Sequence, residues 1–137
     1  MIYLLDTDII SHVLRRSPPL HLIARIAATP LEAQFTSVIT LGELYHGAYR
    51  LGKRASGLLG RLDQLLADEK VVLPFDLAAA RRYGELRADL EGRGTPIGDA
   101  DLRIAAIALD RGLTVVTGNV RRFQRVPGLT VENWLEP

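Results

Sequence analysis

Four acidic residues of this chain stand beside apolar segments, where an unpaired negative charge is costly to bury. They are Asp6, Glu43, Asp99 and Asp101. If the fold brings these carboxylates together, their mutual repulsion raises some of their pKa values unless a cation lies among them. A cluster of carboxylate oxygens, in a chain without cysteine, suits a hard divalent ion such as Mg²⁺ or Mn²⁺. The residue types therefore indicate a divalent-cation site, provided that distant segments converge.

Some of the acidic residues also have ordinary structural explanations. Asp8 and Asp99 each stand where a helix is expected to begin, so either could cap a helix by accepting a backbone N–H. Asp99 could equally form an ion pair with Arg103, four residues further on. Asp101 would be mildly stabilised in a first helical turn by the helix dipole alone. Capping, ion pairing and the helix dipole therefore remain open explanations for these acids.

Asp6 and Glu43 are harder to explain by capping. Asp6 directly follows an expected strand, and Glu43 stands one turn into an expected helix among apolar neighbours. For Glu43, the structural alternative is an ion pair with Arg50, or exposure to solvent between two glycines. We favour a functional role for both carboxylates.

The composition is that of an ordinary globular protein. Its 137 residues are 47% hydrophobic and 24% charged, and the formal net charge is +1. This length predicts one domain, residues 1–137, with a core of its own. The absence of cysteine excludes disulfides, thiolate zinc sites and a cysteine nucleophile. No apolar run is long enough to span a bilayer and no basic leader precedes the first apolar run, so we expect a cytoplasmic protein without a membrane partner.

Short apolar segments alternate with amphipathic ones along the whole chain. The apolar segments predict strands at 2–5, 34–37, 71–73, 114–117 and 129–131. The amphipathic segments predict helices at 8–14, 20–28, 40–50, 57–68, 77–91 and from 99 to 109 or 110. Strands that alternate with helices pair in parallel and are covered on both faces. The sequence therefore predicts an α/β fold, a three-layer α/β/α domain with a short, mainly parallel central sheet.

This architecture can bring the four acidic residues together at one edge of the sheet. Ligands of open α/β sheets bind at the carboxyl ends of the strands, and Asp6 stands at the end of the first expected strand. Glu43, Asp99 and Asp101 stand in the first turns of helices, whose N-termini lie at the same edge when a strand precedes them. Convergence of the four side chains is therefore expected.

Four motifs, in order along the chain, carry a resemblance to a known family. They are LLDTD at 4–8, SVITLGEL at 37–44, PIGDADLRIAA at 96–106, and VVTGNVRRF at 115–123 with the segment 126–134. The first three resemble PIN-domain ribonucleases, and the last resembles the C-terminal part of the VapC-type toxins of bacterial toxin–antitoxin pairs. The likeness spans almost the whole chain, and the order and spacing of the motifs make it more specific than any single motif.

The resemblance implies a metal-dependent endoribonuclease, with Mg²⁺ or Mn²⁺ as cofactor, that a cognate antitoxin holds inactive and that forms a homodimer. By position, Asp6, Glu43 and Asp101 match the acidic core of the family. Asn119 stands where many members have a fourth acid, and an amide adds no charge that would help to hold a second metal ion. Asp99 would compensate by adding a carboxylate beside Asp101.

The expected mechanism is hydrolysis of an RNA phosphodiester by an activated water. We expect Asp6 and Asp101 to hold the principal ion, with Glu43 and Asp99 completing its shell directly or through water. Either Glu43 or Asp99 would take the proton of the water. These four carboxylates are the predicted catalytic residues.

Further residues have supporting roles in this prediction. Thr7 and Thr117 stand beside the site, where their hydroxyls orient water or phosphate, or make structural hydrogen bonds only. Contacts with RNA phosphates are expected from basic side chains, although each could equally lie on a solvated helix face. These are Arg15, Arg50, Lys53, Arg54, Arg103, Arg121 and Arg122. Apolar contacts with an antitoxin or a second copy, or simply core packing, are expected from Leu51, Leu58, Leu59, Leu62 and Leu65.

Two other classes of protein stay open. Asp6 and Asp8, followed later by residues 98–101, also resemble the first and last motifs of haloacid dehalogenase-type phosphatases, with Asp6 as the nucleophile and Asp8 as the general acid. That hypothesis leaves Glu43 without a role and fits poorly with so short a chain. The third hypothesis is a non-catalytic module that binds RNA or protein, which the presence of all the acidic residues disfavours.

Overall fold

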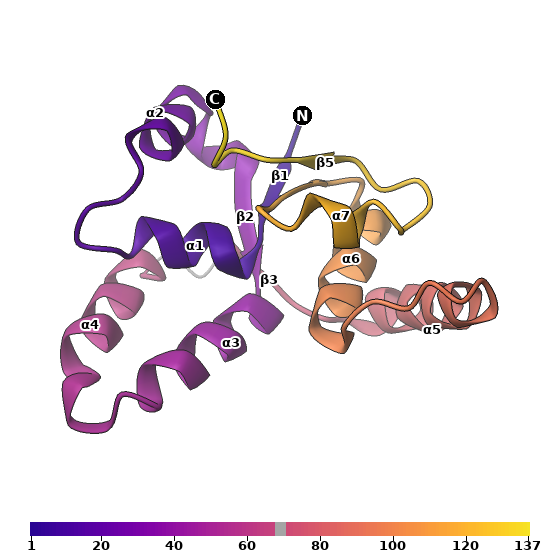
Figure 1. The fold of residues 1–137 in the computed structure, drawn as a ribbon, viewed down its shortest axis with the longest axis horizontal. Coiled ribbons are helices and arrows are strands. Elements are labelled where there is room, and N and C mark those ends of the chain that lie inside the picture. The colour runs from indigo at the N-terminus through magenta and orange to yellow at the C-terminus, as the bar shows by residue number, and fades with distance from the viewer. Residues whose placement is uncertain (68–70) are drawn as a thin grey trace.

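Five short parallel strands form the centre of the computed structural model, which describes residues 1–67 and 71–137 (Figure 1). They are β1 (Tyr3–Leu5), β2 (Gln34–Ser37), β3 (Val72–Leu73), β4 (Thr114–Val116) and β5 (Val131–Glu132). The order across the sheet is β3-β2-β1-β4-β5, and each pair of neighbours is parallel. The first strand of the chain therefore lies in the middle of the sheet.

Alternate residues of the central strands point to opposite faces of the sheet. Leu4 and Val115 belong to the apolar core on one face, whereas Leu5 and Val116 belong to the core on the other. All four side chains are buried. Because both faces of these strands are covered, the strands are continuous apolar runs rather than alternations of apolar and polar residues.

Helices cover both faces of the sheet (Figure 1). They are α1 (Thr7–Val13), α2 (Leu20–Ala28), α3 (Val38–Tyr49), α4 (Ser56–Leu65), α5 (Leu77–Gly92), α6 (Asp99–Arg111) and α7 (Val120–Phe123), with short 3₁₀ helices at Leu31–Ala33 and Gly52–Arg54. Residues of α1, α2 and α4 complete the core that contains Leu5, and residues of α5, α6 and α7 complete the core that contains Leu4. The predicted three-layer α/β fold is confirmed. None of the described helices combines the length and the apolar character that crossing a bilayer would require.

The predicted elements are present with small shifts at their ends. Helix α3 begins at Val38 rather than at Thr40, because Oγ of Ser37 accepts the backbone N–H of Thr40 and so caps the helix earlier. The predicted strand at 129–131 is found at 131–132, and the predicted end of the fourth helix, residue 68, lies outside the described residues. The single turn of α7 was not predicted, because four residues are too few to show a helical period.

The connections between strands leave the carboxyl edge of the sheet in two directions. From β1 the chain passes through α1 and α2 to β2 on one side, and from β4 it passes through α7 to β5 on the other side. β1 and β4 are neighbours whose connections leave in opposite directions. Ligands of open α/β sheets bind at such a switch point. The fold therefore places a candidate site at the ends of β1 and β4.

Candidate active site

The floor of the site is formed where β1 and β4 end. The backbone N–H of Asp6 donates to the carbonyl of Val116 at 2.9 Å, so the pairing of the two strands continues to the first residue of the site. Thr117 follows β4, is fully buried, and donates its hydroxyl to Oδ2 of Asp6 at 2.8 Å. The register of the central strands thus fixes the position of the Asp6 carboxylate.

The carboxylate of Asp6 is short of hydrogen-bond donors. Only 2% of the residue is exposed, and within the described chain its Oδ1 atom is buried without a partner. Burial raises the pKa of Asp6 to about 7, and repulsion from Asp8 and Asp101 contributes to the increase. Buried polar atoms without a partner are rare in native proteins. A cation beside Oδ1 would satisfy this atom and relieve the repulsion among the carboxylates.

Asp8 anchors the loop that follows β4. Its Oδ2 accepts the backbone N–H of Gly118 at 2.8 Å, and its Oδ1 lies 3.4 Å from the hydroxyl of Thr117. Helix α1 begins at Thr7, and Asp6 occupies the N-cap position without a side-chain capping bond. The explanation of Asp8 as a helix cap is therefore wrong. Its partner lies 110 residues away in the sequence, and no local pattern signals such a contact.

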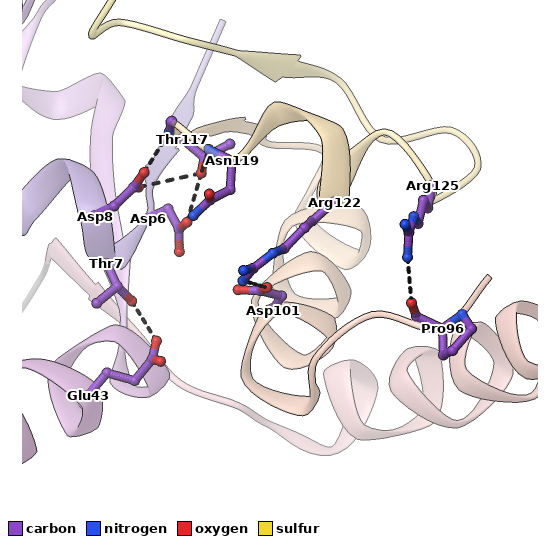
Figure 2. Close-up of polar contacts among 11 residues, drawn as sticks. Asp6, Thr7, Asp8, Glu43, Pro96, Asp101, Thr117, Asn119, Arg122 and Arg125 are labelled. Carbon is purple, nitrogen blue, oxygen red and sulfur yellow. Dashed lines mark hydrogen bonds and ion pairs between the residues drawn. The ribbon is translucent and has the colours of Figure 1, made fainter.

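Glu43 is positioned by a group of hydroxyls at the start of α1 and α3. Thr40 is buried near the capped end of α3, and its hydroxyl oxygen lies 3.2 Å from that of Thr7. Thr7 donates to Oε1 of Glu43 at 2.6 Å. The Glu43 side chain is exposed, but it points toward Thr7 and the end of β1 rather than pairing with Arg50 (Figure 2). Thr7 therefore links the predicted catalytic Glu43 to the strand that carries Asp6.

Asp101 reaches the site from the first turn of α6. Its side chain is 14% exposed, and Oδ2 lies 3.2 Å from Nη1 of Arg122 on α7. The Arg122 side chain is 60% exposed, so the pair lies at the boundary between the site and the solvent. Asp101 is close enough to Asp6 to raise the pKa of Asp6. The two predicted principal ligands are thus neighbours, and a guanidinium group holds one of them.

Asp99 faces outward from the same turn of α6. Its carboxylate accepts hydrogen bonds from the hydroxyl of Tyr83 and, at 2.8 Å, from Nε of Arg103, and its side chain is 56% exposed. The hydrogen bond from Tyr83 lowers the pKa of Asp99, and Arg103 adds to the effect. The N-cap of α6 is Gly98, so the capping explanation of Asp99 is wrong and the ion pair with Arg103 is present.

Figure 2 shows the side chains of Asp6, Glu43 and Asp101 directed toward a common region at the carboxyl edge of the sheet. As they are placed, no three acidic or histidine side chains in residues 1–67 and 71–137 stand close enough to surround one metal ion. Mg²⁺ is usually held by one or two carboxylates and several waters, so it does not need such a cage. The oxygen-only donors and the unpartnered Oδ1 of Asp6 fit a hard divalent cation.

The remaining predicted site residues lie around this group. Asn119 points toward Asp6, and its backbone N–H donates to the hydroxyl of Thr117 at 2.9 Å (Figure 2). Two of the arginines predicted to bind RNA are paired with acidic residues, Arg103 with Asp99 and Arg122 with Asp101. The other basic residues of the prediction are exposed: Arg15, Arg50, Lys53, Arg54 and Arg121. RNA binding stays a prediction for all of them.

Comparison with known proteins agrees with this fold and site. Residues 3–129 match the family model of the PIN domain. Over 98% of each chain, the structure matches that of VapBC from Salmonella typhimurium bound to DNA, with a TM-score of 0.88 and 34% sequence identity. The chain therefore belongs to the PIN-domain family.

Within this family, several of the similar proteins are ribonucleases named VapC. The tRNA(fMet)-specific endonuclease VapC of Salmonella typhimurium is 36% identical over 138 residues, which cover 96% of this chain and 97% of that protein. The VapC ribonuclease Y4jK of Sinorhizobium fredii is 39% identical over 137 residues, 97% of each chain. The predicted ribonuclease of the VapC type is confirmed, and the phosphatase alternative receives no support.

Proposed function

We propose that this chain is a Mg²⁺-dependent endoribonuclease, with Mn²⁺ as an alternative cofactor, that acts in the cytoplasm as the toxin of a toxin–antitoxin pair. The observation that carries the metal dependence is the buried carboxylate of Asp6, whose Oδ1 has no partner in the described chain. Asp6 and Asp101 would hold the ion, with Glu43 and water completing its shell. Support for an RNA substrate comes from the relatives, one of which is named a tRNA(fMet)-specific endonuclease.

The side chains of the site have separate tasks in this proposal. When bound, the divalent ion would activate a water and offset the charge that develops on the phosphate. Thr117 fixes the orientation of Asp6, and Thr7 holds Glu43 where its carboxylate can take a proton from water. Asp99 is an exposed member of the four proposed catalytic acids and would act through water, because its carboxylate already has two hydrogen-bond donors.

Incubation of the purified chain with total RNA tests this proposal. We expect cleavage with Mg²⁺, none with EDTA, and recovery when excess Mg²⁺ is added. Asp6→Asn is expected to reduce the cleavage rate by at least about 100-fold, since it removes a charge that holds the ion and with it several kcal/mol of transition-state stabilisation. Equal cleavage in EDTA, or by Asp6→Asn, would overturn the proposed mechanism.

We also propose a cognate antitoxin as the protein partner. Structures of VapBC from relatives such as Salmonella typhimurium support this. A groove of about 450 Å³ between α1, α3 and α4 is lined by Thr7 and Glu43 together with apolar residues such as Leu51 and Leu58. An apolar segment of the antitoxin could therefore lie in this groove and reach Glu43. Leu62 also lines the groove but is fully buried, so it belongs first to the core.

The predicted homodimer is part of the same proposal. The chain has a mass of 15.1 kDa, so light scattering after size-exclusion chromatography is expected to give twice this value for the purified protein. A mass equal to that of one chain at micromolar concentration would contradict the dimer and would leave the ribonuclease proposal intact.

A further inference from the structure

A second groove lies beside the acidic residues, along α7. Its volume is about 830 Å³, and its walls are the loop after β4, α7 itself and the segment that follows β5. Arg121, Arg122 and Arg125 line it, and the only acidic residue that lines it in the described chain is Glu136. We call this feature the α7 groove.

The positive charge of the α7 groove is only partly balanced by neighbouring acids, because Arg122 is the one of its three arginines that pairs with a carboxylate in the described residues, that of Asp101. Elsewhere, Arg87 in α5 and Arg93 at its C-cap each pair with a carboxylate four residues away. Arg121, in contrast, is exposed and makes no hydrogen bond or ion pair within the described residues. Arg125 donates to the carbonyl oxygen of Pro96 at 2.8 Å, which fixes the guanidinium but leaves its charge unbalanced. Within the described residues, the groove therefore offers two guanidinium groups without a carboxylate partner, and one of them, that of Arg125, is held in place.

The α7 groove begins where the acidic site ends. Its first residues, Gly118 and Asn119, directly follow Thr117, whose hydroxyl holds Asp6. Arg122 belongs to both places, because it lines the groove and its Nη1 lies 3.2 Å from Oδ2 of Asp101. Figure 2 shows this side chain extending from α7 to Asp101. An extended polymer bound in the groove would thus continue directly to the carboxylates.

We propose that the α7 groove binds the RNA strand on one side of the scissile phosphate. Arg121 and Arg125 would contact backbone phosphates, and Arg122 would contact the phosphate nearest to the acidic residues. Guanidinium groups bind phosphate oxygens through paired hydrogen bonds, and basic grooves follow the backbone of single strands. This inference rests on the proposed ribonuclease function and adds the path of its substrate.

The residues that line the α7 groove and the groove between α1, α3 and α4 favour RNA, rather than a protein segment, as the ligand along α7. An RNA that is cut internally must continue beyond the scissile phosphate, so it needs a basic surface that starts at the catalytic acids. The α7 groove has this property. The groove between α1, α3 and α4 is lined by Arg15 and Arg61 as well, but it differs in having a row of apolar residues such as Leu44, Leu51 and Leu58, which suit a folded or helical peptide.

Steady-state cleavage of a short fluorescent RNA by the purified full chain tests the proposal. The test variant is Arg121→Glu, and the matched control is Arg81→Glu, which makes the same charge change at an exposed position of α5. We expect Arg121→Glu to raise KM about tenfold with kcat within about twofold, and to lower the salt dependence of binding by about one counterion. Arg81→Glu is expected to behave as the wild type.

A KM unchanged in Arg121→Glu, or raised equally in Arg81→Glu, would overturn the proposal. So would an Arg121→Glu variant that cleaves RNA normally but escapes inhibition by an antitoxin, because the groove would then be a protein-binding surface. RNA binding is measured separately by fluorescence anisotropy, with Arg121→Glu introduced into the Asp6→Asn variant so that the RNA is not cut during the measurement. This distinguishes failure of the proposed ribonuclease function from failure of the proposed RNA-binding role of the α7 groove. If the wild type cleaves no RNA, the proposed function fails; if it cleaves and Arg121→Glu binds RNA as tightly as its parent, only the groove assignment fails.

Discussion

The ionisation of Asp6 couples the stability of the protein to pH. Its pKa is about 7 in the folded chain, chiefly because of burial, and 3.8 is the ordinary value. As pH rises between these two values, the unfolded chain releases this proton while the folded chain keeps it, so the free energy of unfolding falls; above about pH 7 this contribution is constant. We expect the metal-free protein to unfold at a higher temperature near pH 6 than near pH 8, measured by thermal denaturation in EDTA.

Asp6→Asn is the control for this pH dependence. The amide has nearly the same shape and does not titrate, so the difference between the two pH values should be smaller in the variant. Mg²⁺ should raise the melting temperature of the wild type near pH 8, since a cation stabilises the ionised carboxylate. A variant with the same pH dependence as the wild type would show that other groups are responsible.

Gly118 has no room for a side chain. A Cβ atom at this position would lie 2.6 Å from Oδ2 of Asp8 and 2.9 Å from Cδ1 of Leu135. We expect Gly118→Ala to break the contact between Asp8 and the loop after β4, to destabilise the fold by about 1–3 kcal/mol, and to reduce kcat by at least about tenfold because Thr117 moves. RNA cleavage and urea denaturation measure the two effects.

The matched control is Gly84→Ala, inside α5. Apart from its chain neighbours and the backbone of its own helix, no atom of the described residues lies within 4 Å of the added Cβ there, and alanine is the better helix former by about 0.5–1 kcal/mol. This substitution should leave activity unchanged and stability equal or higher. A Gly118→Ala variant with wild-type kcat would show that the loop does not position the catalytic acids.

At the scale of elements, one helical turn carries two acids with different surroundings. Asp101 is mostly buried and close to Asp6, whereas Asp99 is exposed and already accepts hydrogen bonds from Tyr83 and Arg103. We expect Asp101→Asn to lower RNA cleavage at saturating Mg²⁺ by at least about 100-fold, because the charge of a proposed metal ligand is lost. Asp99→Asn should lower it by no more than about tenfold. Equal losses would show that the two carboxylates contribute alike.

The elements themselves were largely predictable, and the reasons are local. The helix at 20–28 and the strand at 34–37 have the predicted bounds, because apolar spacing and the flanking prolines and turn residues define them. The turn of α7 was missed, since its one buried residue, Phe123, shows no period. The presence of the acids Asp6, Glu43 and Asp101 near one sheet edge followed from their places at the ends of strands and starts of helices.

The contacts within the site were not predictable from the sequence. Asp8 binds Gly118, and Arg122 pairs with Asp101 rather than with solvent. Both contacts depend on the lateral order of the strands, which places the segment after β4 beside the end of β1. A single sequence gives the order of elements along the chain, but it does not give their order across the sheet.

At the scale of the whole molecule, Trp134 joins the two ends of the chain. It is fully buried, its ring packs edge-on against Tyr3 of β1 at 4.9 Å, and its Nε1 donates to Glu132 at 3.0 Å. The guanidinium of Arg25 on α2 lies 5.0 Å from the ring centre. Figure 1 shows the C-terminal segment crossing between β1 and α2. The C-terminal segment is thus part of the core that contains Leu5.

We therefore expect Trp134→Ala to lower the free energy of unfolding by about 3–5 kcal/mol, measured by urea denaturation, because a large buried side chain is lost. Leu77→Ala is the control: this residue is 89% exposed, so the change should be within about 0.5 kcal/mol. Similar unfolding midpoints for the two variants would show that the C-terminal segment does not contribute to the folded core.

The hydrogen bond between Thr117 and Asp6 joins residues that are 111 positions apart. While the ribosome is still making the polypeptide, Asp6 is released early, but β1 has no neighbour on one side until β4 has emerged. A nascent chain that ends before Thr117 therefore lacks the hydrogen bond that fixes the Asp6 carboxylate. The proposed ribonuclease activity is therefore expected only after translation has passed Thr117.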